Sequence, residues 1–561
     1  MFIYDLNESH SVIDFSDETP ESALQKRLQL IDILSCFVDN YQFTPSYRAG
    51  FWDGKKHFYD INPEMNMRIP KGLVESVLDK FEVSKPYTPL SEIPKVDIRD
   101  LKPFIKSLNL SFKPYDYQIK AFYIAITQGR KILLSATGSG KSLIIYMIMR
   151  WFEQKNLKGM LIVPNVGLVE QMRSDFIDYA KNENDPQEFI DNIVHIIYAG
   201  KEKNLNKPIT VTTWQSAILM NPQEFKQLDY VLIDEAHLAA GESLTKLIEI
   251  SENCKYKIGL TGTLPKEYEH RFQLTATLGK SENIVNAQGL IERGLATPVE
   301  VLMWYLNYPE EEKKIVKKMK YPQELKYLEE HHQRNLFMAK IGIQVSEKYG
   351  NTLMLYNTIS HGDFLLKLVL QEKFNISNVF VLEKITPMRV KKMKDENPEK
   401  IFTLVPLSLK DKKTLLKYYS EDEINDKFDN LSKYHIYIIK GEIDGEKRNS
   451  IRALLEENTD AILIATFQTL STGVNVKNLH NILLCASTKS YVRVMQTIGR
   501  GLRLHISKEK MRLFDFIDDF SKKTKTGKIQ NKNYMLKHSD ERIEFYFEAG
   551  FPIKEKEISI N

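Results

Sequence analysis

Cysteine is scarce in this sequence, and long apolar runs are missing. The 561 residues include three cysteines, Cys36, Cys254 and Cys485, which lie far apart and form no CxxC pair. This spacing argues against a zinc site and against a disulfide framework, and it is typical of a reducing compartment. No apolar run approaches the roughly 18 residues of a membrane span, and the acidic start MFIYDLNESHSVID is unlike a signal peptide. We therefore expect a cytoplasmic protein with no membrane partner.

A large net charge is also missing. The 78 Lys and Arg residues nearly balance the 74 Asp and Glu residues, which leaves a net charge of +4. Any binding to nucleic acid must therefore depend on local patches rather than on a field from the whole molecule. With 42% hydrophobic and 27% charged residues, the chain is typical of a globular protein, and its length is enough for three or four domains.

Short apolar runs alternate with amphipathic stretches in two parts of the chain. From about residue 110 to 300 the runs are KILLSA, GMLIVP, PITVTT, YVLIDE and YKIGLTGT, and after residue 340 they are NTLMLYN, YHIYIIKG, DAILIATF and NILLCAS. Continuous apolar runs are typical of buried parallel strands, and the alternation predicts doubly wound α/β sheets. We predict a small α+β domain over residues 1–95, α/β domains over 96–305 and 306–520, and a basic extension, 521–561, packed on the second.

Four segments around these domains give more detailed expectations. The stretch SKPYTPLSEIPK reads as a linker after the first domain, and YRAGFWDGKKHFYD predicts a β-hairpin that turns at Asp53 and Gly54. The charged residues 310–335 predict a solvated helix that bridges the two α/β domains. Residues 378–432, also charged, are too many for an ordinary connection and predict a helical or partly mobile insertion in the second domain.

The segment SATGSGKS, residues 135–142, follows an apolar strand and opens a helix, which is the context of a phosphate-binding P-loop. Backbone N–H groups around Gly138 and Gly140 would surround phosphate oxygens at the positive end of the helix. Lys141 would neutralise the β- and γ-phosphates, and Ser142 would offer its hydroxyl to Mg²⁺. Ser135 stands where glycine or alanine is common, a mild departure. The alternative is a glycine-rich turn with a solvated lysine. The loop residues expected to bind nucleotide are Thr137, Gly138, Ser139, Gly140, Lys141 and Ser142.

The segment VLIDEAH ends another apolar strand with two carboxylates. Strand carboxyl ends in open α/β sheets face the ligand crevice. Asp234 would hold Mg²⁺, Glu235 would polarise the attacking water, and His237 would sense the γ-phosphate or relay to the other domain. A DE pair alone is often a solvated strand end, but beside a P-loop it indicates hydrolysis of a nucleoside triphosphate.

The segment QTIGRGLR, residues 496–503, carries two arginines one helical turn apart. Arg500 and Arg503, with Gln496, would reach the phosphates when the two α/β domains close, and an arginine finger is worth roughly 10³ to 10⁵ in rate. The alternative is a pair of surface arginines.

These motifs resemble, in their order, those of superfamily 2 helicases over about residues 115–505. The resemblance rests on YDYQIKA, LIVPNVGLVEQ (motif Ia), TVTTWQS, DEAH (motif II), GLTGT (motif III), TFQTLSTGVNV (motif V) and QTIGRGLR (motif VI). It is closest to the UvsW-like helicases of bacteriophages, through YRAGFWDGKKHFYD, ISHG, GEIDGEKRN, STGVNVKNLH and NYMLKHSDERI. It implies RecA-like α/β domains, adenine recognition by Gln118 and nucleotide contacts from Gly473 and Asn475.

The resemblance also implies that one nucleic-acid strand is held by its phosphates. For each serine or threonine, local capping is nearly as good an interpretation. The matching positions are Pro164, Gln171, Thr213, Gln215, Ser360, His361, Thr466, Thr469 and Ser471.

The amino-terminal domain offers a further candidate surface for DNA. Arg48, Lys55 and Lys56, beside Trp52, could meet a backbone or stack on exposed bases. Against this, residues 1–100 contain 17 acidic and 11 basic side chains, and Trp52 could instead anchor the core. The tail 521–537 has six lysines and no acid, so it is either a solvated segment or a contact to the DNA backbone.

Together these features imply an ATP-dependent DNA helicase or translocase that uses ATP and Mg²⁺. By resemblance it would act on duplex, forked or branched DNA, or RNA–DNA hybrids, in recombination, replication and repair, by branch migration, fork regression and unwinding of D-loops and R-loops. Two alternatives stay open: an RNA helicase, and a nucleotide-gated protein that binds DNA junctions without unwinding them. The expected partners are DNA and phage recombination or single-strand-binding proteins. We expect a monomer, in the cytoplasm of a host cell if a phage encodes it.

Overall fold

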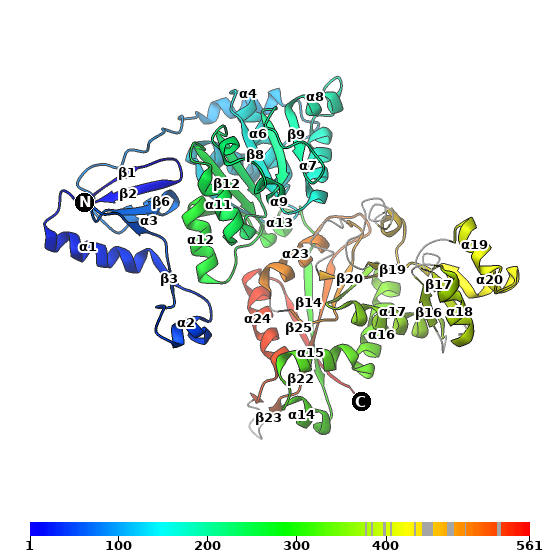
Figure 1. The fold of residues 1–561 in the computed structure, drawn as a ribbon. Helices are drawn as coiled ribbons and strands as arrows, with labels where there is room; N and C mark the ends of the chain where they lie inside the picture. Colours follow the sequence, from blue (N-terminus) through cyan, green and yellow to red (C-terminus); the bar gives the residue numbers. More distant parts are fainter. Residues whose placement is uncertain are drawn as a thin grey trace. The chain divides into compact units, whose positions relative to one another are not determined.

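A computed structural model describes residues 1–375, 379–382, 385–396, 400–403, 407–430, 434–439, 451, 453–467, 476–488, 490–523 and 529–560. The chain divides into two units, Met1–Asn286 and Ala287–Asn561. Within these described residues, each unit contains a seven-stranded parallel sheet (Figure 1). This confirms the predicted fold class: two doubly wound α/β domains preceded by a small α+β region.

The first α/β domain has the strand order β13-β7-β12-β11-β8-β10-β9, and neighbouring strands are parallel. Every residue of β8, β10, β11 and β12 is buried, as expected for central strands covered on both faces. The five predicted apolar runs in this part of the chain are therefore strands. The bounds are β7 (Arg130–Ser135), β8 (Gly159–Val163), β9 (Val194–Ile197), β10 (Ile209–Thr213), β11 (Tyr230–Asp234), β12 (Tyr256–Thr261) and β13 (Ser281–Val285).

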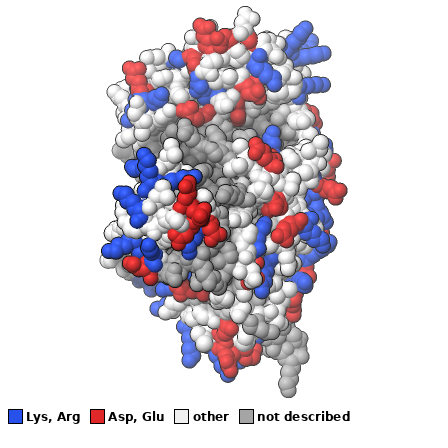
Figure 2. Space-filling model, turned by 90° about the vertical axis from the view of Figure 1, so that its right-hand side faces the viewer, with Lys and Arg blue, Asp and Glu red and all other residues white. Residues whose placement is uncertain are grey.

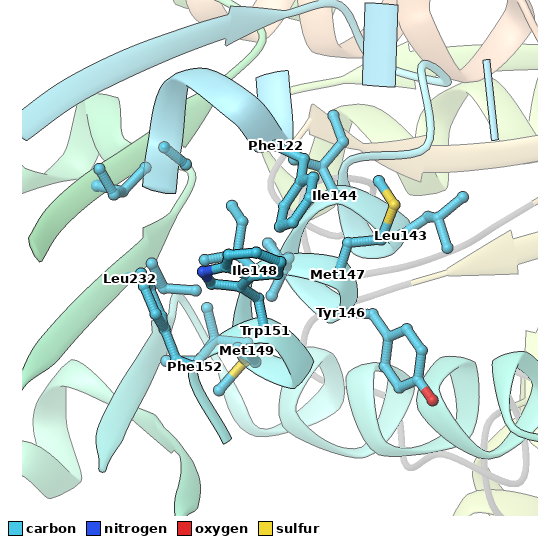
Figure 3. Packing of buried hydrophobic residues seen from close by; sticks show 14 of the residues in the cluster. Phe122, Leu143, Ile144, Tyr146, Met147, Ile148, Met149, Trp151, Phe152 and Leu232 are labelled. Atoms are coloured by element: carbon cyan, nitrogen blue, oxygen red, sulfur yellow. The ribbon is translucent and has the colours of Figure 1, made fainter. Parts of the chain in front are cut away.

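Helices cover both faces of this sheet. One face carries α4 (Ile98–Ser107), α5 (Asp116–Gln128), α6 (Lys141–Glu153), α7 (Val166–Tyr179) and α8 (Pro186–Ile193). The other carries α9 (Trp214–Ala217), α10 (Pro222–Phe225), α11 (Glu242–Ile250) and α12 (Tyr268–Leu278). Helix α6, which starts at the P-loop, is buried continuously over 143–152. Its side chains, including Trp151, pack with Phe122 of α5 and Leu232 of β11 (Figure 3). This packing holds the start of α6 firmly against the sheet.

The amino-terminal region forms the predicted small α+β domain, but the predicted hairpin is wrong. Strand β4 pairs with β3 across a long loop, and the segment before Asp53 contains the short helix α2. The four-stranded antiparallel sheet of this region has the order β1-β2-β6-β5. The bounds are β1 (Phe2–Asp5), β2 (His10–Asp14), α1 (Pro20–Ile33), β3 (Ser35–Phe37), α2 (Pro45–Arg48), β4 (Lys55–His57), β5 (Asp60–Ile61), β6 (Met67–Pro70) and α3 (Val74–Leu78).

Buried charged groups join this small domain to the first α/β domain. Lys257 of β12 is fully buried, and its Nζ donates to Ser9 Oγ at 2.5 Å and to the Glu8 carbonyl at 3.2 Å. Arg130 of β7 also donates to the Glu8 carbonyl. Lys71 bridges the buried carboxylates of Asp5 and Glu8, at 2.6 Å each. Because a buried charge is costly without its partners, the region 1–95 is fixed to the sheet rather than tethered by a linker.

The second unit has the strand order β19-β20-β15-β21-β22-β14-β25. Its four predicted apolar runs are strands β15, β19, β20 and β21. The bounds are α13 (Ala287–Glu292), β14 (Val299–Asn307), β15 (Thr352–Tyr356), α17 (Ile359–Phe374), β19 (Ile436–Ile439), β20 (Ile462–Thr466), β21 (Asn481–Leu484), α23 (Tyr491–Gly501), β22 (Met511–Asp519), β23 (Lys522–Lys523), β24 (Ile529–Gln530), α24 (Tyr534–Glu548) and β25 (Ile553–Ser559).

Two boundaries of this unit differ from the sequence prediction. Residues 287–305 belong to the second unit, because β14 pairs along its whole length with β22. Residues 553–559 are not an appended extension, since β25 pairs with the other edge of β14 and completes the sheet. β25 reads IKEKEIS and lacks the apolar run of a buried strand, whereas β14 reads VEVLMWYLN and was missed despite its apolar run.

The charged stretch 310–335 is not a bridging helix. It forms α14 (Glu310–Val316), α15 (Tyr321–Glu330) and the start of α16 (His332–Tyr349), all within the second unit. Arg334 is 2% exposed, and its guanidinium bonds both oxygens of the buried Asp518 carboxylate, at 2.7 and 3.0 Å. The charged residues of this stretch therefore include a buried one, Arg334, as well as solvated ones.

The insertion is a small α/β body with its own core. Parallel strands β16 (Val379–Leu382), β17 (Lys400–Thr403) and β18 (Phe428–Asn430) pair in that order. Helices α18 (Pro387–Glu396), α19 (Leu409–Leu415) and α20 (Glu421–Lys427) accompany them. Val390, Met393, Ile401 and Phe428 are buried together. We predicted a helical or partly mobile segment and did not predict this sheet, because the three strands are only three or four residues long.

Candidate nucleotide and nucleic-acid site

The P-loop lies between the end of β7 and the start of α6, as predicted, and Gln118 supports it. The Gln118 side chain is 4% exposed; its Nε2 donates to the Ser139 carbonyl at 2.9 Å, and its Oε1 accepts from the Tyr115 backbone N–H at 2.9 Å. Gly140 has a φ of +79°, and a Cβ there would lie 2.5 Å from Gln118 Nε2. Gln118 thus contacts the loop itself, and only glycine fits at this point of closest approach.

Lys141 and Ser142 begin α6 at the mouth of this loop. Lys141 Nζ lies 3.4 Å from the Ser135 carbonyl oxygen, so the ammonium is folded back over the loop. The Ser142 hydroxyl shares a 2.7 Å hydrogen bond with the Tyr179 hydroxyl at the end of α7. Burial raises the pKa of Tyr179 to about 12. A tyrosine therefore holds the serine expected to meet Mg²⁺.

The strand order brings the acidic motif beside the loop. β7, β12 and β11 are consecutive neighbours, so the P-loop and the DEAH segment are separated by one strand, about 10 Å at the usual spacing. At the end of β12, a Cβ on Gly262 would lie 3.4 Å from the Thr137 backbone nitrogen. The GLTGT segment therefore lies directly against the P-loop.

Asp234 is buried at the carboxyl end of β11 without full compensation for its charge. Asp234 is 7% exposed, and its Oδ1 atom has no hydrogen-bond partner among the described residues. Burial, together with the neighbouring Glu235 carboxylate, raises the pKa of Asp234 to about 7, while Lys141 acts in the opposite direction. An unpaired buried carboxylate oxygen beside a P-loop lysine fits a site for a cation or for water bound to one.

Glu235 and His237 are tied to the next strand. Glu235 has φ 50° and ψ 52°, a left-handed conformation that is uncommon outside glycine and is found at functional sites. His237 Nδ1 lies 3.0 Å from Thr261 Oγ1 and 3.4 Å from Glu235 Oε2. The Thr261 hydroxyl in turn donates to the Thr263 carbonyl at 2.9 Å. Thus His237 connects the acidic motif with GLTGT in the same domain.

The motif VI residues lie in the second unit, on and just after α23. Arg500 is in the last turn of this helix, but Arg503 follows its C-cap residue, Leu502. The prediction that the two arginines lie one turn apart on a helix is therefore wrong. Lys508, 7% exposed, holds this end of the helix: its Nζ donates to the carbonyl of Gly501 at 2.9 Å and to those of Lys477 and Leu479.

Several expected nucleic-acid contacts lie at the carboxyl ends of strands. Pro164 and Gln171 follow β8, and Gln215 follows β10 and is exposed. Ser360, also exposed, follows β15, and Thr466 ends β20. Strand ends at one edge of a parallel sheet form a common surface, so each unit presents its own set. The expected residues Thr469, Ser471, Gly473 and Asn475 lie outside the described residues.

Two side chains that were expected to contact nucleic acid, those of His361 and Thr213, are buried instead. His361 is 1% exposed and its Nε2 bonds Asn335 Oδ1 at 2.8 Å, so its side chain belongs to the interior. Burial lowers the pKa of His361 to about 3. Thr213 is 3% exposed and its hydroxyl caps α9 through the Ser216 N–H at 3.3 Å. These two side chains are committed to the fold, and the capping alternative holds for Thr213.

The basic residues of the amino-terminal domain are partly neutralised. Lys55 lies 3.4 Å from the Asp32 carboxylate and Lys56 lies 3.7 Å from that of Glu269. Trp52 is half-buried and donates from Nε1 to the Lys55 carbonyl at 2.8 Å, whereas Arg48 is exposed. Local charge pairing therefore weakens the case for this surface of the amino-terminal domain. Figure 2 shows another face of the molecule, on which acidic and basic side chains are interspersed.

Sequence reasoning missed several residues that support the site. Tyr117 donates to the Ser139 carbonyl at 3.0 Å. In the sequence, only its position next to Gln118 could have pointed to this role. Tyr179, which bonds Ser142, is 37 residues away in the chain and carries no motif. Lys508 follows motif VI but has no pattern of its own.

Comparisons with known proteins agree with this geometry. Family models match over residues 9–88 (DNA helicase UvsW, N-terminal), 111–266 (Type III restriction enzyme, res subunit) and 394–505 (Helicase conserved C-terminal domain). The chain is 28% identical over 550 residues to the ATP-dependent DNA helicase uvsW of Enterobacteria phage T4, covering 95% of each chain. The structure of the ATP-dependent Type ISP restriction-modification enzyme LlaBIII bound to DNA is 13% identical with a TM-score of 0.51, over 80% of this chain and 31% of that one, which is a likeness of fold. No helix in the described part of the chain has the length and apolar character to cross a membrane.

Proposed function

This chain belongs to the UvsW-like superfamily 2 helicases, and we propose that it couples ATP hydrolysis to movement on branched or duplex DNA. The finer activities are branch migration, fork regression and unwinding of D-loops and R-loops in recombination, replication and repair. They are supported by similarity to the phage T4 helicase along 95% of both chains. DNA is accordingly the proposed partner.

The observation that carries the proposal is the cluster of groups at three neighbouring strand ends. The P-loop, the buried and unpaired Asp234 carboxylate, and the Glu235–His237–Thr261 connection all lie at the carboxyl ends of β7, β11 and β12. In such sites the N–H groups and lysine of the P-loop neutralise phosphate charge, and a carboxylate orients the attacking water. We assign these roles to Lys141 and Glu235.

Mg²⁺ would be held by Ser142 and Asp234, and it would neutralise charge on the phosphate oxygens. His237 keeps the Glu235 carboxylate in place through its bond to Thr261. We infer that Arg500 and Arg503 supply the positive charge that the terminal phosphate needs, and that the uncharged amide of Gln496 assists them by hydrogen bonding. Hydrolysis would then depend on both α/β domains.

The test measures ATP turnover on a panel of substrates: single strands, duplexes, forks, four-way junctions, displacement loops, RNA–DNA hybrids and RNA. We expect stimulation by branched DNA, and a loss of about 100-fold or more in Lys141→Ala, because one charge-stabilising donor is typically worth 10² to 10³. Lys120→Ala, an exposed lysine of the same domain, is the matched control. Stimulation by RNA alone would identify an RNA helicase, and DNA binding without turnover would identify a clamp.

A further inference from the structure

A hollow lined by lysines opens at the carboxyl edge of the sheet in the second unit. It has a volume of about 360 Å³, and its lining includes Lys313, Lys317, Lys522, Lys532, Lys537 and Tyr534. These residues come from α14, from the segment after β22, and from the start of α24. We call it the lysine hollow. Tyr534 and Lys537 belong to the segment NYMLKHSDERI, to which the proposed motor assigns no role.

The positive charge of the lysine hollow is largely unbalanced. Its one acidic lining residue, Glu324, is 1% exposed, and its carboxylate accepts from the N–H groups of Tyr534 and Met535 and from Asn533 Nδ2. Lys313 pairs with Glu310, whose carboxylate also interacts with Lys522 at longer range, and Lys532 pairs with Asp540. Within the described ranges, no carboxylate lies in ion-pairing distance of Lys317, Lys522 or Lys537. Three ammonium groups are therefore available to an anion.

A second depression, of about 550 Å³, lies between α15 and α17. Its lining includes Tyr321, Leu325, Thr358, Ser360 and Phe364, and we call it the aromatic groove. Two carboxylates also line it: Glu329 accepts from the Thr358 hydroxyl, and Glu330 pairs with Lys326. It contains Ser360, one of the positions expected to contact a nucleic-acid strand. The groove is therefore next to the proposed path of that strand.

Two tyrosines connect the groove with the hollow. Tyr321 lines the groove, Tyr534 lines the hollow, and their ring centroids are 5.9 Å apart. Each side chain is 39% exposed. In the strand order, β22 is two positions from β15, so the hollow begins about 10 Å along the sheet edge from Ser360. Lys537 Nζ lies 5.5 Å from the Tyr534 ring, so charge and aromatic surface meet there.

We propose that the aromatic groove and the lysine hollow together bind a segment of single-stranded DNA beyond Ser360, an inference that rests on the proposed function. Aromatic faces bind unpaired bases of any sequence, and lysines bind the adjacent phosphates. Three free ammonium groups correspond to about three phosphates. The surface would hold the strand between motor steps without reading its sequence.

The test replaces the three unpaired lysines together, as Lys317→Gln, Lys522→Gln and Lys537→Gln, in the full chain. Each neutralised phosphate contributes about 0.7 to the salt dependence of single-strand binding. The slope of log affinity against log salt for a fluorescent 20-nucleotide strand should therefore fall by about 2. The matched control is Lys348→Gln, Lys367→Gln and Lys410→Gln, which removes three exposed lysines of the same unit outside both depressions. ATP turnover without DNA serves as the folding control.

Tyr534 gives a second, independent measurement. Tyr534→Ala should weaken single-strand binding roughly 5-fold or more, the effect of losing one stacked base, and leave the salt slope unchanged. Tyr534→Phe keeps the ring and should restore the affinity.

The inference would be overturned if the triple variant and the control variant had the same slope of log affinity against log salt. It would also be overturned if the triple variant lost affinity only for a blunt duplex. Failure of the proposed function looks different, because the wild-type protein would then show no ATP turnover stimulated by DNA.

Discussion

Replacing Lys508 with methionine tests how the motif VI arginines are held in position. The Lys508 ammonium donates to three backbone carbonyls, those of Gly501, Lys477 and Leu479, at 2.9 to 3.2 Å. Gly501 ends α23, and Arg500 precedes it directly. The bond therefore joins the end of the motif VI helix to the segment that precedes β21.

Two opposing changes determine the expected effect of Lys508→Met on stability. Burial lowers the pKa of Lys508 to about 8, with Glu456 raising it and Arg503 lowering it. At about 1.4 kcal/mol per pH unit, a fall from the usual 10.5 costs the folded state about 3 kcal/mol while the ammonium is charged. Methionine removes this cost, but it leaves three buried carbonyls without this donor, at about 1–3 kcal/mol each. The net change in the free energy of unfolding should therefore be a loss of between about 0 and 6 kcal/mol.

ATP turnover should also fall in Lys508→Met. A displacement of about 1 Å in a catalytic group can reduce the rate about 100-fold. We therefore expect Lys508→Met to lose 10- to 100-fold in ATP turnover at saturating DNA, with little change in the affinity for ATP. Lys510→Met, which removes a lysine paired with Glu300 at the surface, is the control.

The pH dependence provides the decisive readout. Because the folded pKa is about 8 and the unfolded value is 10.5, the unfolded chain binds more protons between these values, and the contribution of Lys508 to stability rises with pH in that window. Turnover should move the opposite way, since a neutral amine has two N–H groups for three carbonyls. Wild-type ATP turnover should fall above about pH 8. This fall, the alkaline limb of the pH profile, should be absent in Lys508→Met. A variant with wild-type turnover, or with the alkaline limb intact, would refute the reasoning.

Three further changes test other parts of the molecule. Lys71→Met leaves the Asp5 and Glu8 carboxylates buried without their shared partner, so urea unfolding of the unit 1–286 should show a loss of about 3–5 kcal/mol; an unchanged midpoint would contradict this. His361→Gln should flatten the acid dependence of stability: the folded pKa of about 3 lies below the unfolded 6.5, so this stability is complete above pH 6.5 and falls by about 2 kcal/mol by pH 5. Equal losses in both proteins between pH 7.5 and 5 would speak against the burial of His361. Gln118→Ala removes the side-chain bond to the P-loop and should raise the KM for ATP about 10-fold, from about 1.4 kcal/mol; steady-state kinetics with an unchanged KM would exclude that role.

The sequence predicted some strands with continuous apolar runs and missed several others. β8, β10 and β11 are buried on both faces, so their apolar runs are continuous and easy to recognise. The edge strand β25 has no such run, since it reads IKEKEIS and most of its residues are exposed, and β14 and β22 were missed although they lie inside the second sheet. The pairing of β3 with β4 was missed because it closes a loop of 17 residues, whereas the Asp53-Gly54 signal is local. Short-range patterns do not record contacts made over such distances.

By itself, the sequence determined the phosphate-binding loop, the acidic strand end and the order of the α/β elements. These features depend on residues that are neighbours in the chain, so local spacing is enough to specify them. The tertiary structure alone decided which side chains support them: Tyr179 against Ser142, Thr261 against His237, Lys508 under α23 and Lys257 beneath the amino-terminal domain. Each of these contacts joins elements that packing brings together, and the free energy that selects such a partner comes from burial, which no short segment of the chain carries alone.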